Sequence, residues 1–64
     1  MASYYRPIID LLSQHGWEFD REAKGSHEMW RNPKTGRKVS VPYDCEKRHT
    51  ANGILKDAGI RKKL

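Results

Sequence analysis

The sequence contains a single cysteine, Cys45, and no uninterrupted apolar segment near the ~20 residues that a membrane-spanning helix requires. One cysteine excludes an internal disulfide and a metal site built on a pair of cysteines. Residues 1–7 contain no apolar run of the length found in signal peptides. These absences predict a cytoplasmic protein that works in a reducing compartment.

Recognisable metal-ligand spacing is also missing. The acidic residues Asp44, Glu46 and Asp57 match no zinc or calcium pattern when they are combined with the histidines, so we expect no metal site and no cofactor. A length of 64 residues predicts a single domain over residues 1–64 with one small core.

Positive charge, by contrast, is in excess: 13 Lys and Arg face 8 Asp and Glu, for a net charge of +5. A small basic domain is attracted to nucleic acid because its binding to phosphates releases counterions. Most of the cations lie in the second half of the chain, which ends in Arg61, Lys62 and Lys63. Those of the predicted hairpin could equally form a solvated strand edge that discourages pairing. The residues that we expect to contact RNA phosphates are Arg31, Lys34, Arg37, Lys38, Lys47 and Arg48.

Apolar spacing predicts helices over residues 6–15 and 50–58, each closed by a glycine, Gly16 or Gly59. Between them, strands are predicted over residues 17–23, 27–31 and 37–41, with a hairpin turn at 32–36. The order α-β-β-β-α predicts an α+β two-layer sandwich. In this fold both helices cover one face of a three-stranded antiparallel sheet, and its other face stays open.

Details of these elements can also be predicted. Alternation in the first strand predicts that it is half-buried, with Trp17, Phe19 and Arg21 on one face. Thr50 is the residue type that caps a helix N-terminus, so we expect it to begin the last helix. In the second strand Trp30 offers the larger apolar area and belongs in the core, which places His27 on the open face.

His27 is the side chain best suited to transfer a proton near pH 7. Its imidazole could take a proton from a 2′-hydroxyl or donate one to a leaving 5′-oxygen. Arg31, on the same face, could hold the phosphate through two hydrogen bonds. The alternative is that His27 is an ordinary surface residue where a strand begins.

Other polar side chains are weaker candidates. Ser26 could orient His27 or contact a phosphate, although serine is also common in turns. His49 could meet a phosphate at the N-terminus of the last helix or belong to an ordinary loop. Lys47 and Arg48 predict a lowered pKa for the Cys45 thiol, but without a base partner we expect no function for Cys45.

Several short motifs, taken in order, resemble the HicA toxins of bacterial and archaeal toxin–antitoxin pairs. The resemblance covers roughly residues 7–60 and includes the opening helix closed by Gly16-Trp17. Its other motifs are Gly25-Ser26-His27, Trp30, Pro33, Val39-Ser40-Val41-Pro42, Thr50 and the ending Ile54-Leu55-Lys56-Asp57-Ala58-Gly59-Ile60.

The resemblance implies a fold similar to double-stranded-RNA-binding domains and an endoribonuclease that cleaves mRNA. It implies that His27 is the catalytic histidine and that a HicB antitoxin covers the active face. On this reading the chain is a monomer when free and a hetero-oligomer with its antitoxin. The sequence departs from many relatives at Glu28, at Tyr43-Asp44 and at His49.

The residues by themselves are also compatible with two other functions. A non-catalytic RNA-binding module would read RNA shape through phosphates and 2′-hydroxyls. A protein-interaction domain would use its basic face to dock an acidic partner.

Overall fold

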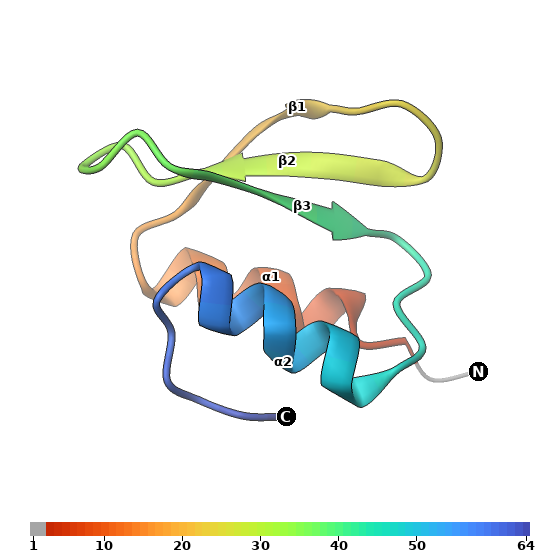
Figure 1. Cartoon of the computed structure of the whole chain (residues 1–64). Coiled ribbons are helices and arrows are strands. Elements are labelled where there is room, and N and C mark those ends of the chain that lie inside the picture. The colour runs from red at the N-terminus through yellow and green to blue at the C-terminus, as the bar shows by residue number, and fades with distance from the viewer. Residues whose placement is uncertain (1–2) are drawn as a thin grey trace.

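The computed structural model describes residues 3–64, which form two helices and three strands in the predicted order (Figure 1). The elements are α1 (Tyr5–Gln14), β1 (Glu18–Glu22), β2 (His27–Arg31), β3 (Lys38–Pro42) and α2 (Arg48–Asp57). The strands form one antiparallel sheet in the order β1-β2-β3. Both helices lie beneath the same face of this sheet, which confirms the α+β two-layer sandwich (Figure 1).

The core lies between the helices and the central and third strands. Ile8 and Leu12 of α1, Val41 of β3 and Leu55 of α2 are fully buried. Trp30 of β2 is 8% exposed, so it belongs to the core as its apolar area predicts. Because β-strand side chains alternate, the burial of Trp30 places His27, Met29 and Arg31 on the open face.

The turns follow the predicted chemistry. The Trp17 N–H donates to the Leu12 carbonyl at 2.9 Å across Gly16, whose φ of +86° a side-chain-bearing residue adopts only with strain. The end of α2 repeats this arrangement, with the Ile60 N–H donating to the Leu55 carbonyl at 2.8 Å. Both helices therefore end where their glycines predict.

Strand β1 corrects the predicted first strand. Phe19 pairs with Trp30, but the next paired residue is Arg21 opposite Met29, because a bulge displaces Asp20. All five residues of β1 are exposed, and Phe19 is 51% exposed. The helices pack chiefly beneath β3, so they cover little of β1, and the prediction of a half-buried strand was wrong. Because of the bulge, the side chains of Arg21 and Phe19 lie on opposite faces of the sheet.

The beginning of α2 is a second correction. The helix starts at Arg48 with Lys47 at its N-cap, so Thr50 lies inside the first turn and caps nothing. The buried side chains of Cys45 and Ala51 hold the chain on either side of Lys47, and the Tyr4 N–H donates to the Cys45 carbonyl at 2.7 Å. This packing places the N-cap at Lys47, three residues before Thr50, although Thr50 is the better capping residue type.

Burial also decides the chemistry of Cys45. The side chain is 4% exposed, and desolvation raises the pKa of its thiol. The closeness of Lys47 and Arg48 in sequence had predicted a lowered pKa, and this prediction was wrong: a hydrogen bond with the Lys47 backbone lowers the pKa, but desolvation is the larger effect. Cys45 is a core residue of this fold.

Candidate active site

His27 is exposed, and it stands at the start of the central strand of the sheet. Its carbonyl accepts the Ala23 N–H at 3.0 Å, and on the other side the residue pairs with Pro42 of β3. The carbonyl of the preceding Ser26 accepts the Tyr43 N–H at 2.8 Å. The backbone at His27 is therefore hydrogen-bonded to the neighbouring chain segments on both sides, while the residue is exposed to solvent.

Arg31 lies at the other end of β2. Four residues of extended chain separate the Cα atoms of His27 and Arg31 by about 13 Å. At this end Arg31 pairs with Lys38 of β3, and the turn between them carries Lys34 and Arg37. We call these four residues the hairpin cluster. Arg31 and Lys38 of this cluster lie at the opposite end of the sheet from His27, which pairs with Pro42.

Acidic side chains reduce the charge of the hairpin cluster. Asp20 of the bulge lies with its Oδ2 atom 3.5 Å from the Lys38 Nζ atom. Glu18 of β1 stands directly opposite Arg31. Lys34 is exposed within the turn, whereas Arg37 closes the turn opposite Asn32 and lines a hollow with Ile54 and Asp57 of α2.

The cations of α2 do not join the His27 site. Lys47 and Arg48 lie at the start of α2, with His49 in its first turn. That helix belongs to the layer beneath the sheet, whereas the His27 side chain is on the open face (Figure 1). The structure therefore places His49 in a different layer from the His27 side chain.

Arg21 is a residue of this site that the sequence did not reveal. It stands opposite Met29, diagonally across from His27 on the open face, at a typical separation of about 7–8 Å. A guanidinium side chain spans that distance and can bind a phosphate held at His27. The strict alternation of strand residues placed Arg21 with Phe19, and only the bulge moves it to the open face.

Glu28 supports the site from beneath. Its carboxylate is buried, and one oxygen accepts the Tyr5 hydroxyl at 2.7 Å and the Trp30 indole N–H at 2.8 Å. These bonds join α1 to the central strand next to His27. Side chains alternate along β2, so Glu28 lies on the same face as Trp30, toward the core. This position was the signal in the sequence that Glu28 has a structural function.

Tyr5 makes this support sensitive to high pH. Burial, the hydrogen bond to Glu28 and the negative charge of Glu28 together raise the pKa of Tyr5 to about 12. Because the folded pKa exceeds the ordinary value of 10.0, the stabilisation is complete below pH 10 and is lost as pH rises through about 12.

We therefore expect the free energy of unfolding of the wild type to decrease between pH 10 and 12. Most of this decrease should be absent in the Tyr5→Phe protein. Urea unfolding of both proteins across this range measures the difference. Desolvation also raises the pKa of Tyr43, with Glu28 and Glu22 adding to it, so Tyr43→Phe should remove a smaller part. Identical pH profiles for Tyr5→Phe and the wild type would contradict the expectation.

The structure also limits other kinds of site. Within residues 3–64 no three His, Cys, Asp or Glu side chains are grouped as metal ligands. In the same part of the chain, neither helix has the length and apolar character needed to cross a membrane.

Comparison with known proteins agrees with the motif order described above. A family model described as "HicA toxin of bacterial toxin-antitoxin" matches residues 5–60, which include both helices, the whole sheet and His27. Searches of curated proteins and of solved structures found no significant match. The match spans nearly the whole chain, and this protein belongs to the HicA family of bacterial toxin–antitoxin toxins.

Proposed function

We propose that this protein is an endoribonuclease toxin that cleaves mRNA with His27 as its general acid or base and without a metal ion. The observation that carries the proposal is the position of His27. Its imidazole is exposed on a backbone bonded at both sides, on the uncovered face of the sheet, with Arg21 diagonally opposite. The family of toxins to which the chain belongs supports the same conclusion.

The reaction requires a proton acceptor, a proton donor and a cation beside the phosphate. The 2′-hydroxyl of RNA attacks the adjacent phosphorus, the bond to the 5′-oxygen breaks, and the products carry a 2′,3′-cyclic phosphate and a 5′-hydroxyl. Neutral His27 takes the proton of the 2′-hydroxyl while water protonates the departing 5′-oxygen, or protonated His27 protonates that oxygen while water accepts the 2′-hydroxyl proton. Arg21 stabilises the negative charge that accumulates on the phosphate oxygens.

The separation of the two arginines predicts different effects. Arg21→Gln should lower the rate of cleavage at saturating RNA, because its guanidinium acts where the bond breaks. Arg31→Gln should instead weaken RNA binding and leave that rate within about twofold, because Arg31 lies about 13 Å from His27. Single-turnover cleavage measured over a range of protein concentrations separates the two effects. Equal losses of rate would contradict this division.

The antitoxin partner belongs to the same proposal. The open face carries Arg21 near His27 and Arg31 and Lys38 at the other end of β2, and no segment of residues 3–64 covers it. A HicB-type antitoxin bound over this face would exclude mRNA from His27. We propose that the toxin is a cytoplasmic monomer when free and forms a hetero-oligomer with this antitoxin.

One observation favours a second candidate function, a non-catalytic RNA-binding module. His27 is the only histidine that the described residues place on the open face, since His49 lies in the helix layer. A domain with a single proton carrier could bind RNA by its phosphates without cutting it.

An RNA cleavage assay in excess EDTA, with the wild type and His27→Ala, distinguishes the two functions. Cleavage by the wild type alone is the expected result and identifies a metal-free nuclease. RNA binding without cleavage by the wild type would replace the nuclease with the binding module.

A further inference from the structure

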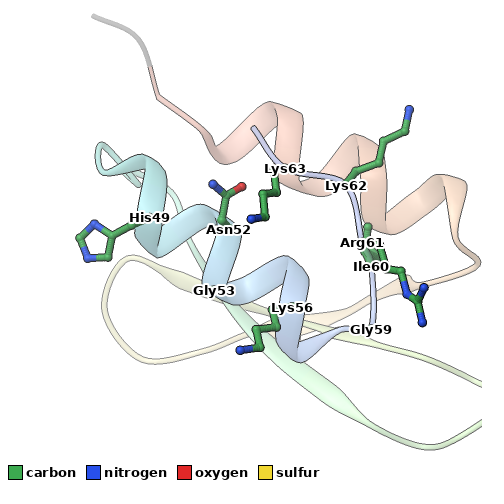
Figure 2. A pocket seen from close by; sticks show the side chains of 9 residues that line it. All are labelled: His49, Asn52, Gly53, Lys56, Gly59, Ile60, Arg61, Lys62 and Lys63. Carbon is green, nitrogen blue, oxygen red and sulfur yellow. The ribbon is translucent and has the colours of Figure 1, made fainter.

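A second basic surface lies on the helix layer, away from His27. The chain after α2 turns back at Gly59 and runs beside the helix, leaving an open hollow of about 650 Å³ between them (Figure 2). Residues of α2 form one wall of the hollow, and residues 59–63 form the other. None of the roles proposed above uses this surface.

Asn52 of α2 fixes the outer wall. Its side-chain oxygen accepts the Leu64 N–H at 2.7 Å, and its amide group donates to the Leu64 carbonyl at 3.4 Å. Leu64 also packs against the hydrophobic core, and Ile60 at the other end is 4% exposed. The tail is thus held at both ends, so the hollow is a built feature of the fold.

The hollow is lined by cations and by no Asp or Glu side chain. Lys56 extends from α2, and Lys63 reaches from the tail toward Asn52, while His49 stands at the far end of the helix (Figure 2). Arg61 and Lys62 extend from the tail away from α2, so they add positive charge along the rim (Figure 2). Such a concentration of one sign attracts anions strongly.

Gly53 leaves the α2 surface bare where it lines the hollow. A glycine inside a helix costs about 1 kcal/mol relative to alanine. A Cβ atom added at Gly53 would meet no atom within 4 Å, so no packing in the fold requires glycine there. A side chain at this position would instead occupy the hollow that Gly53 lines. The bare helix surface keeps that space open.

We propose that this hollow binds the phosphodiester backbone of RNA, as a site separate from the cleavage site at His27. Lysine ammonium groups bind phosphates as point charges and need no fixed geometry. An acidic protein would need exposed apolar or aromatic anchors at the centre of its interface. The one large apolar residue of the lining, Ile60, is already buried in the core. The observations therefore favour a polynucleotide over a protein.

The site would hold RNA on one side of the molecule while the open face of the sheet acts on the other. This inference rests on the proposed function for its ligand, RNA, but it does not require that His27 cleave. It can be tested in the His27→Ala protein, which leaves the RNA intact during the measurement.

The sharpest test replaces Gly53 by two side chains of equal size, Gly53→Glu and Gly53→Gln. Both residues favour helices, and both have open space, so we expect both proteins to fold. The glutamate should weaken binding about five- to tenfold more than the glutamine, because only its charge repels phosphates. Fluorescence anisotropy with a labelled single-stranded RNA of about 12 nucleotides measures this ratio near 0.1 M salt.

The same pair of substitutions at Ser13, an exposed residue of α1, controls for the change in net charge. We expect Ser13→Glu and Ser13→Gln to differ by less than about twofold. Equal ratios at Gly53 and Ser13 would overturn the proposal. The proposal would also be overturned if the substitutions at Gly53 changed the binding of poly-glutamate but not the binding of RNA. That result would assign the hollow to an acidic protein.

A second measurement avoids any change in the backbone. Lys56→Gln should reduce the dependence of log affinity on log salt by about 0.7, the contribution of one phosphate contact on single-stranded RNA. Arg6→Gln, which removes one exposed charge from α1, should leave that slope unchanged. Equal slopes in the two variants would contradict the site. If the wild type failed to cleave RNA while Lys56→Gln lost its phosphate contact, the nuclease would fail and the binding site would stand.

Discussion

His27→Ala is expected to lower the rate constant of RNA cleavage by about 10²–10⁴-fold, the usual contribution of one general acid or base. The large effect follows from the structure of the open face, where residues 3–64 place no second histidine. RNA binding should change little, because the phosphate contacts that we propose are made by other residues. Single-turnover cleavage in excess EDTA measures the rate, and anisotropy with intact RNA measures binding.

The fold should survive this substitution. The His27 side chain is exposed, and the hydrogen bonds that hold the residue are made by backbone atoms. Exposed substitutions of this kind usually change the free energy of unfolding by less than about 0.5 kcal/mol. Circular dichroism and thermal unfolding check this, and His27→Gln supplies a polar control without an acid–base group. An unfolded His27→Ala protein would mean that the residue is structural.

Glu28→Ala should be the most destabilising of the substitutions considered, lowering the free energy of unfolding by about 2–4 kcal/mol. The change removes one acceptor and leaves two donors, the Tyr5 hydroxyl and the Trp30 indole N–H, without their partner. Donors left unsatisfied away from water cost more than the bond itself contributed. A domain of 64 residues has a small reserve of stability, so a loss of this size is a large fraction of it.

Glu28→Gln is the matched control. The amide oxygen has nearly the same shape and can still accept from both donors, so we expect a loss of about 1 kcal/mol. Urea unfolding at neutral pH compares the two variants with the wild type. If alanine cost no more than glutamine, the two hydrogen bonds would not be what joins α1 to β2.

The order of the elements and their turns could be predicted because they depend on local chemistry. Gly16 and Gly59 end their helices through backbone conformations that other residues adopt only with strain. The apolar area of Trp30 placed it in the core, and alternation then placed His27 on the open face. Each of these predictions depends on a few neighbouring residues, and tertiary packing agrees with them here.

The errors arise where packing outweighs a local preference. The bulge at Asp20 depends on how β1 meets β2, and nothing in the five residues of β1 marks it. The start of α2 depends on the burial of Cys45 and Ala51, which overrides the capping preference of Thr50. Burial likewise determines the direction in which the pKa of Cys45 moves.

The sequence by itself determined the element order, the exposed histidine and the family to which the chain belongs. Only the tertiary structure decided which cations stand near that histidine. Arg31 shares a strand and a face with His27 but lies at the far end, whereas Arg21 comes from another strand through a bulge. Face and strand follow from local alternation, but distance between side chains depends on strand register, and register is set by contacts between residues far apart in the chain.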